Sequence, residues 1–416
     1  MNDRPSVSST DDIALDAPDR PYARAGGPPP ADRRNHLLVY GLLLTIAMIA
    51  VPVLTYTGLR ALLDSRDGEV IDPQLDPSQP GYQALVSPSP TLAVVHVGPE
   101  GELVGVAMLA LAGQDDRGGS VLLVPPATVA SVPEFGDLTL EYVQHANGTD
   151  TTVSLTEWIL RTGIDEIVEV DHDDWAEMTR PFGGLTLTNP DELRSPDGEV
   201  VFPAGRRTLL PEEIGPYLAF LESDETALNQ ILRQELVWDA LLRAVAAEPD
   251  TASFAGEQDR GLARFVPGLA AGTRRIAALP VTVDQVPTLE GPAAFYPDEQ
   301  AIAALIPRLV PFPAGGRPGD RPLVRVLDGS QRPEVLTPAV RLVARAGGQV
   351  VMIGNADEFG VEATRLLVAD DALIGLAESV AAELGVGSVQ RIDYIDENAE
   401  LIVVLGADFH PPPQLR

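Results

Sequence analysis

The chain has 416 residues and a formal net charge of −32, because it contains 61 acidic residues and only 29 basic ones, all of them arginine. Such a chain repels the phosphates of nucleic acids, whose binding needs clustered basic side chains, so we expect no nucleic-acid partner. Cysteine is absent and the five histidines are not spaced as metal ligands, which excludes disulfides and cysteine-based redox or zinc chemistry and predicts no metal site.

The N-terminal part predicts a membrane anchor. Residues 1–35 are rich in Pro, Ser, Asp, Gly and Ala, which is typical of a disordered tail. Residues 37–59 carry no charge and are long enough, at ~1.5 Å per residue, to cross a hydrocarbon core of ~30 Å. A buried helix or a cleaved signal peptide is the alternative, but the stretch is too long for a signal core and no small-residue cleavage pattern follows it. Arginines gather before the span, so the positive-inside rule predicts a single-pass protein of the cell membrane with a cytoplasmic N-terminus and an extracytoplasmic bulk.

A globular domain is predicted after a stalk. Residues 60–88 are polar and contain prolines, which favours a stalk. From 89 to 312, apolar runs alternate with helical patterns. Strands are predicted at 92–97, 104–111, 121–124, 167–170 and 185–187, and helices at 154–160, from 171 onward, and along an apolar stripe of Leu228, Ile231, Leu232 and Leu236. Ser154 is the expected N-cap of the first helix, and Ser223 or Asp224 that of the last.

A second, smaller domain is predicted at the C-terminus. Residues 313–322 are rich in Pro and Gly and form the clearest boundary in the chain. Within 323–410, strands are predicted at 323–327, 350–353, 365–368 and 401–405, and helices at 336–346 and 372–384. The alternation predicts an α/β fold class, with α+β as the alternative: a larger mixed α/β domain followed by a small α/β sandwich.

The C-terminal domain resembles the one that closes many actinobacterial LytR-CpsA-Psr proteins. The similarity rests on Val324-Arg325-Val326-Leu327-Asp328-Gly329-Ser330, on Ala346-Gly347-Gly348-Gln349-Val350, and on Val403-Val404-Leu405-Gly406-Ala407-Asp408-Phe409. Asp328 stands where the family usually has Asn. The resemblance covers nearly the whole domain but implies no established chemistry.

The larger domain also resembles the LytR-CpsA-Psr domain. The stretch 167–175 with Pro181-Phe182-Gly183-Gly184-Leu185 is similar to the family's strand, helix and Gly-Gly turn. Phe202-Pro203-Ala204-Gly205 is similar to the lead into its long helix, where Arg233-Gln234 matches an Arg-Gln pair. Family members transfer a glycopolymer from a polyprenyl-pyrophosphate carrier to peptidoglycan or a related acceptor. The resemblance therefore implies phosphoryl chemistry, with arginines on the pyrophosphate and carboxylates for Mg²⁺ or proton transfer.

The residues that would perform this chemistry are missing. The family's Arg-x-Asp-Thr strand aligns with Pro88-Ser89-Pro90-Thr91, and its Pro-Arg-Asp-Thr motif with Pro125-Pro126-Ala127-Thr128. Its paired arginines fall at Ala219 and Leu221, and a further arginine at Gln230. Four losses at positions that should meet one phosphate predict a catalytically inactive domain with no catalytic residues.

Five residues are candidates for binding a ligand: Arg233, Gln234, Arg206, Arg207 and Arg180. Arg233 and Gln234 are predicted to point away from the apolar stripe of their helix, where the alternative role is a solvated helix face. Arg206 and Arg207 are predicted to lie in a loop between a strand and a helix, where they either contact a phosphate or are simply exposed surface residues. The acidic run 171–174 is predicted to cap a helix and not to hold a metal.

Three functions follow. The first is a non-catalytic relative that keeps the fold, and with it an apolar lipid groove, and binds or modulates polyprenyl-linked glycopolymer assembly with other envelope proteins, without a cofactor. The second is an active transferase that uses the displaced arginines and Mg²⁺; it requires those arginines to converge at the mouth of the groove. The third, a membrane-tethered transcription regulator, is opposed by the acidic charge and the outward topology.

Overall fold

The computed structural model describes residues 74–112, 116–132, 136–222, 225, 227–254, 256–283, 294–395 and 398–412. The predicted tail, the predicted membrane span and most of the predicted stalk lie outside these residues. Within them, no helix is both long enough and apolar enough to cross a membrane.

The larger domain is built on a five-stranded mixed sheet in the order β12-β4-β3-β2-β7. The strands are β2 (Thr91–Val97), β3 (Leu103–Leu111), β4 (Gly119–Val124), β7 (Glu166–Val170) and β12 (Arg274–Ala278). β3 runs antiparallel to β2 and β4, while β7 and β12 pair in parallel at the two edges. The central strands are continuous apolar runs because both of their faces are covered.

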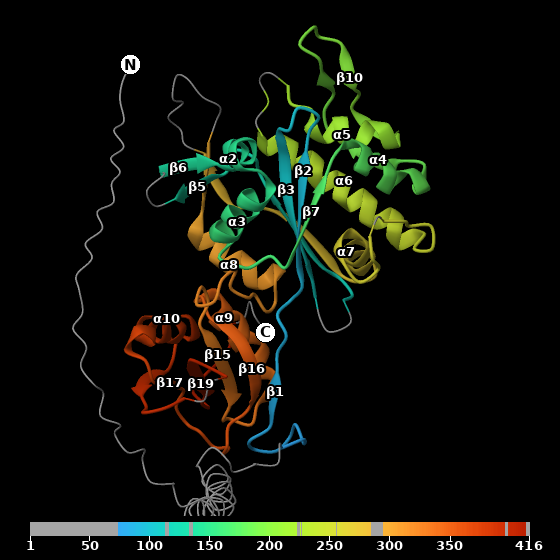
Figure 1. The fold of residues 1–416 in the computed structure, drawn as a ribbon. Coiled ribbons are helices and arrows are strands. Elements are labelled where there is room, and N and C mark those ends of the chain that lie inside the picture. The colour runs from blue at the N-terminus through green and yellow to red at the C-terminus, as the bar shows by residue number, and fades with distance from the viewer. Residues whose placement is uncertain are drawn as a thin grey trace, which may run out of the picture. The chain divides into compact units, whose positions relative to one another are not determined.

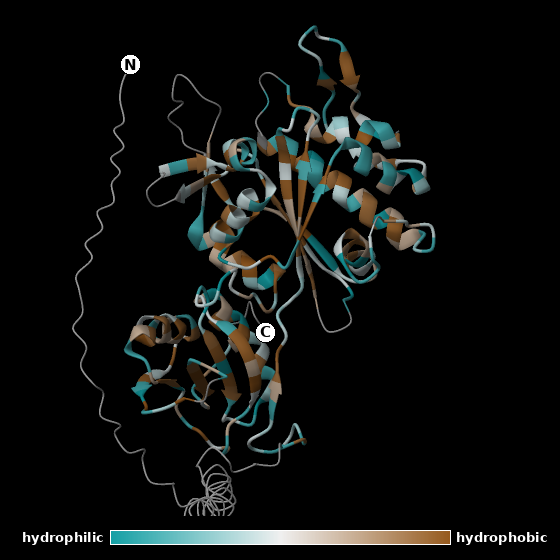
Figure 2. Ribbon diagram, viewed as in Figure 1, coloured by the Kyte–Doolittle hydropathy of each residue, from teal (hydrophilic) through white to brown (hydrophobic). Residues whose placement is uncertain are grey.

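Helices cover both faces of this sheet, which gives three layers (Figure 1). One face packs against α4 (His172–Thr179), α5 (Pro211–Ala219), α6 (Ala227–Ala247) and α7 (Gly261–Ala270). The other packs against α2 (Leu140–Asn147), α3 (Thr149–Leu160) and α8 (Glu299–Leu309). Two hydrophobic cores result, and the strands are the most apolar part of the ribbon (Figure 2).

Short strands and turns decorate the layers. Four pairs form two-stranded sheets: β5 (Val129–Val132) with β6 (Gly136–Thr139), β8 (Leu185–Asn189) with β11 (Gly205–Leu209), β9 (Leu193–Arg194) with β10 (Val200–Phe202), and β13 (Val281–Val283) with β14 (Phe295–Pro297). The 3₁₀ turn η2 (Arg180–Phe182) follows α4. Helix α3 begins at Thr149 after Gly148, so the predicted start at Ser154 is wrong. This start left no capping signal in the sequence, because the residue before it, Gly148, has no side chain that could cap the helix.

The C-terminal domain is a six-stranded sheet in the order β1-β16-β15-β19-β17-β18. Five of the six strands belong to the C-terminal domain: β15 (Leu323–Asp328), β16 (Gln349–Asn355), β17 (Arg365–Val368), β18 (Ser388–Arg391) and β19 (Leu401–Leu405). The helices α9 (Leu336–Arg345) and α10 (Ile374–Leu384) share one core with one face of the sheet, and η3 (Pro333–Val335) and η4 (Asp371–Leu373) lead into them. The predicted mixed α/β architecture is confirmed for both domains.

The sixth strand, β1 (Gln83–Leu85), comes from the segment predicted as a stalk. It pairs antiparallel with β16 at the edge of the C-terminal sheet. The side-chain amide of Asn355 adds bonds to the carbonyls of Pro77 and Gln79, 2.9 and 2.7 Å long. This part of the predicted stalk is therefore fastened to the C-terminal domain and does not hang free.

Candidate functional site

The first half of α6 turns polar side chains into the protein. Gln230, Arg233 and Gln234 are all buried, and Arg233 is only 2% exposed. Leu232, predicted as part of the inward stripe, is 53% exposed. The helix is thus rotated relative to the prediction, and the expectation that Arg233 and Gln234 lie on a solvated face is wrong.

These polar groups bind the C-terminal end of α5. The amide of Gln230 donates to the carbonyls of Leu218 and Ala219, at 3.0 and 3.4 Å. Arg233 donates to the carbonyl of Phe220 and forms a buried ion pair with Glu225. The last carbonyls of a helix lack partners within the helix and carry partial negative charge, so donors are stabilising there. Gln230 and Arg233 act here as a cap for α5.

Gln234 holds α6 against the sheet. Its amide donates to the carbonyl of Val104 on β3 over 2.9 Å. A Cβ at Gly105 would lie 2.6 Å from the same amide nitrogen, so a larger residue on the strand would push this amide aside. The amide therefore serves the packing of helix on sheet.

Tyr217 is buried near two of the candidate arginines, Arg233 and Arg207, whose charges act on its hydroxyl. Its hydroxyl donates to Oδ1 of Asn189 over 2.9 Å, and its ring packs edge-on against Phe202 with centroids 5.1 Å apart. Burial raises the pKa of Tyr217 to about 12, while the positive charges of Arg233 and Arg207 act in the opposite direction. Arg207 lies over the Phe202 ring, 5.8 Å from its centroid. The Tyr217 hydroxyl thus remains protonated at neutral pH and serves as a donor.

The other candidates lie elsewhere. Arg206 neighbours Arg207 on β11, where successive side chains point to opposite faces, and it is exposed. Arg180 is 59% exposed and pairs with Glu212 at 3.8 Å on the surface. Arg207 faces Glu213 at 3.5 Å. The convergence of four arginines that an active transferase would require is absent from the described part of the chain.

A second buried polar centre surrounds His96, near the C-terminal end of the apolar strand β2. The His96 ring lies 5.4 Å from that of His172 and 5.9 Å from that of Trp175, centroid to centroid. Nε2 of both histidines and Nε1 of Trp175 are buried without a hydrogen-bond partner among the described residues. Burial, and secondly the charge of His172, lower the pKa of His96 to about 3, although Asp171 acts against the shift. His96 is therefore neutral at physiological pH.

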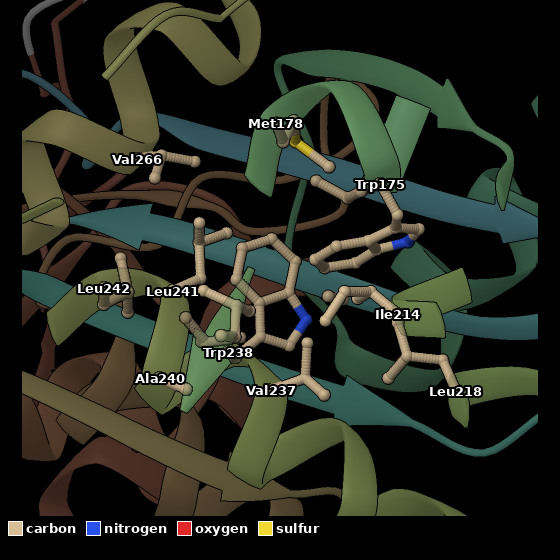
Figure 3. Close-up of a cluster of buried hydrophobic side chains, with 14 of the residues drawn as sticks. Trp175, Met178, Ile214, Leu218, Val237, Trp238, Ala240, Leu241, Leu242 and Val266 are labelled. Atoms are coloured by element: carbon tan, nitrogen blue, oxygen red, sulfur yellow. The ribbon is translucent and has the colours of Figure 1, made fainter. Parts of the chain in front are cut away.

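Large apolar side chains fill the space between the sheet and helices α4 to α7. Trp175 and Trp238 lie next to each other in this layer (Figure 3). Their rings meet edge to face, with centroids 5.3 Å apart. Beside them, between Gln234 and His96, remains a cavity of about 10 Å³, room for about one water molecule. Side chains therefore leave little free space in this part of the domain.

The acidic run at the start of α4 is a helix cap, as predicted. The side chain of Asp171 accepts the backbone N–H groups of Asp173 and Asp174, and Asp174 returns a bond to the N–H of Asp171. These backbone bonds lower the pKa of Asp171, whereas burial raises that of Asp174. No group of three or more potential ligands suited to a metal occurs in the described ranges.

His96, Tyr217, Asn189 and Glu225 were not among the predicted site residues. Only His96 carried a local signal, since a polar ring interrupts an otherwise apolar run from Leu92 to Val97. The other three owe their position to contacts between distant segments.

The C-terminal geometry has a counterpart among known families. Residues 322–409 match the model of the family described as LytR cell envelope-related transcriptional attenuator, LytR_C. These residues are similar to the LytR_C family over nearly the whole C-terminal domain. The predicted resemblance to LytR-CpsA-Psr proteins is confirmed for this part of the chain.

Three solved structures are similar to part of the chain. TagV of Bacillus subtilis is 17% identical over 54% of this chain and 97% of its own, with a TM-score of 0.44. The LytR-CPS2A-psr family protein YwtF (TagT), with bound octaprenyl pyrophosphate, is 15% identical over 57% and 92%, with a TM-score of 0.41. A transcriptional regulator from Enterococcus faecalis is 10% identical over 53% and 87%, with a TM-score of 0.43. No curated protein matches the sequence.

Proposed function

We propose that this chain is a membrane-anchored, extracytoplasmic protein of the cell envelope that modulates the assembly of polyprenyl-linked glycopolymers without catalysing the transfer. The LytR_C domain supports a role at the envelope. The observation that carries the proposal is the state of Arg233, which is buried, paired with Glu225 and bonded to the carbonyl of Phe220. A guanidinium held in this way is not available to a pyrophosphate.

The interior supports a modulating role over a lipid-carrying one. A site for a small molecule usually encloses roughly 300–1000 Å³. The space beside Gln234 and His96 measures about 10 Å³, and Trp175 and Trp238 fill the layer next to it. A polyprenyl tail would enter this part of the interior, next to Arg233 and Gln234, only if these side chains moved. We therefore place the activity of the protein at its surface, in contacts with other envelope proteins.

The experiment is a binding measurement on the full chain in detergent with octaprenyl pyrophosphate, the ligand named for YwtF (TagT). We expect no saturable binding, with or without Mg²⁺. Saturable binding that ignores Mg²⁺ would contradict the filled interior and make the protein a lipid carrier. Tight binding that needs Mg²⁺ would contradict the loss of the catalytic centre.

An active transferase is the second candidate, favoured by the positive charges of Arg207 and Arg233, which both act on the hydroxyl of Tyr217. Such an enzyme would release polyprenyl phosphate when given a carrier-linked polymer and an acceptor, and Arg207→Gln would abolish the release. The control is Arg206→Gln, a change on the exposed side of the same strand. We expect no release above the level without protein from any of the three chains.

A further inference from the structure

β7 is an edge strand with one unpaired side. It pairs in parallel with β2 and has no other strand neighbour in the sheet. Among the described residues, only β2 bonds to the backbone groups of Glu166–Val170. Roughly half of the N–H and C=O groups of a strand point to each side, so β7 presents a row of free donors and acceptors.

A cleft of about 1110 Å³ runs along this free edge. Its walls are α4 on one side and residues 253–254 and 256–262 on the other. Its apolar lining comes from Ile167, Val168 and Val170 of the strand and from Met178, Pro181, Phe254 and Leu262, and of these Ile167 is 42% exposed. The cleft is large enough for an extended peptide and continuous with a strand edge that lacks a partner.

The cleft carries an excess of negative charge. Six acidic and two basic residues line the cleft, which gives a net charge of −4. The acidic residues are Asp165, Glu166, Glu169, Asp174, Glu177 and Glu257, and the basic ones are Arg180 and Arg260. Glu166 is already engaged, since its carboxylate accepts the N–H of Gly261 at 2.7 Å. Glu177 on α4 and Glu257 on the opposite wall are exposed and form no ion pair in the described part of the chain. Two free carboxylates therefore face the cleft from its two walls.

We propose that the β7 cleft binds an extended, Lys- or Arg-containing segment of a partner protein, which joins the sheet as an added strand. Backbone bonds to β7 supply affinity that is independent of sequence, and alternate side chains supply the selectivity. Side chains on one face of the segment would lie between the two walls, where basic ones would reach Glu177 and Glu257, and the alternate, apolar ones would lie on the other face beside Ile167. The inference stands apart from the proposed role in glycopolymer assembly, because it uses neither Arg233 nor the filled interior.

The test uses the full chain in detergent and a fluorescent peptide of alternating Lys and Val, long enough to span the five residues of β7. Fluorescence anisotropy gives its affinity, with the Glu and Val counterpart as the control peptide. Glu177→Gln combined with Glu257→Gln should weaken binding of the Lys peptide roughly tenfold at low salt, and less at high salt. Glu378→Gln, an equally exposed change on α10, should leave the affinity unchanged.

Hydrogen exchange of the complex separates strand addition from simple charge attraction. The bound peptide should slow exchange of the amides in 166–170 and leave β18, the free edge of the other sheet, unchanged. The proposal is overturned if the Lys peptide fails to bind, if the double variant binds it as well as the unaltered chain does, or if β7 exchange is unaffected by bound peptide.

Discussion

The buried ion pair on α6 gives the sharpest test of the idea that Arg233 has a structural role. In Arg233→Met, the carboxylate of Glu225 would remain in a site where its side chain is 7% exposed, without its cation. The carbonyl of Phe220 would lose its donor as well. Removing one partner of a buried pair costs about 3–5 kcal/mol, and we expect a loss of that size in the free energy of unfolding.

The matching double variant separates the pair from the packing around it. Arg233→Met with Glu225→Leu removes both charges together, and replacing a buried pair by apolar groups is often close to neutral. Glu225 also accepts the N–H of Glu222 at 3.2 Å, a bond that would be lost at a cost of about 1 kcal/mol. The double variant should therefore recover more than half of the stability that the single variant loses.

Tryptophan fluorescence during urea unfolding is the assay. The three tryptophans, Trp158, Trp175 and Trp238, all lie in the larger domain, so the signal reports on the domain that holds the pair. Arg206→Met, on the exposed strand face, is the control and should stay within about 0.5 kcal/mol. A loss below about 1 kcal/mol for Arg233→Met would refute the structural role and make ligand binding the better explanation of this arginine.

Three further changes test other parts of the structure. The pKa of His96 is about 3 in the folded chain and ~6.5 in the unfolded chain, so between these pH values only the unfolded chain binds a proton on this ring. The free energy of unfolding should therefore fall as the pH drops from about 6.5 towards about 3, by up to ~5 kcal/mol. His96→Leu should flatten this slope in urea midpoints measured across that range, and an unchanged slope would contradict the argument. A Cβ at Gly354 would lie 2.0 Å from a backbone oxygen of the β1 segment, so Gly354→Ala should loosen β1 and speed the hydrogen exchange of its amides. Gly375→Ala is the control, because a Cβ there meets open space and should leave this exchange unchanged. Equal exchange in the two variants would show that β1 is held by other means. Trp238→Ala should cost about 3–5 kcal/mol in urea unfolding, because it leaves a cavity in the larger core, and a cost below 1.5 kcal/mol would mean that this core is loosely packed.

The strands of the larger sheet could be predicted because their environment leaves a local signal. β2, β3 and β4 are covered on both faces, so each is a continuous apolar run. β1 gave no such signal, since it is three residues long, lies in a polar segment with prolines, and forms only where β16 offers an edge. Pairing between segments so distant in the sequence is set by the tertiary structure and not by local pattern.

The sequence could show which candidate residues lie on α6, but not whether they are buried and already paired. Counting apolar residues placed Leu232 inside and left Arg233 and Gln234 outside, whereas the helix buries both polar residues and exposes the leucine. The cause lies in α5, whose terminal carbonyls need donors that only a neighbouring helix can supply. A motif match therefore says which side chain is present but not whether its charge is free. In this chain the guanidinium of Arg233 already has a carboxylate and a carbonyl, so any ligand phosphate would have to displace Glu225 in a buried site. That cost is the physical reason to expect modulation, and not transfer, from a domain that keeps the Arg-Gln pair.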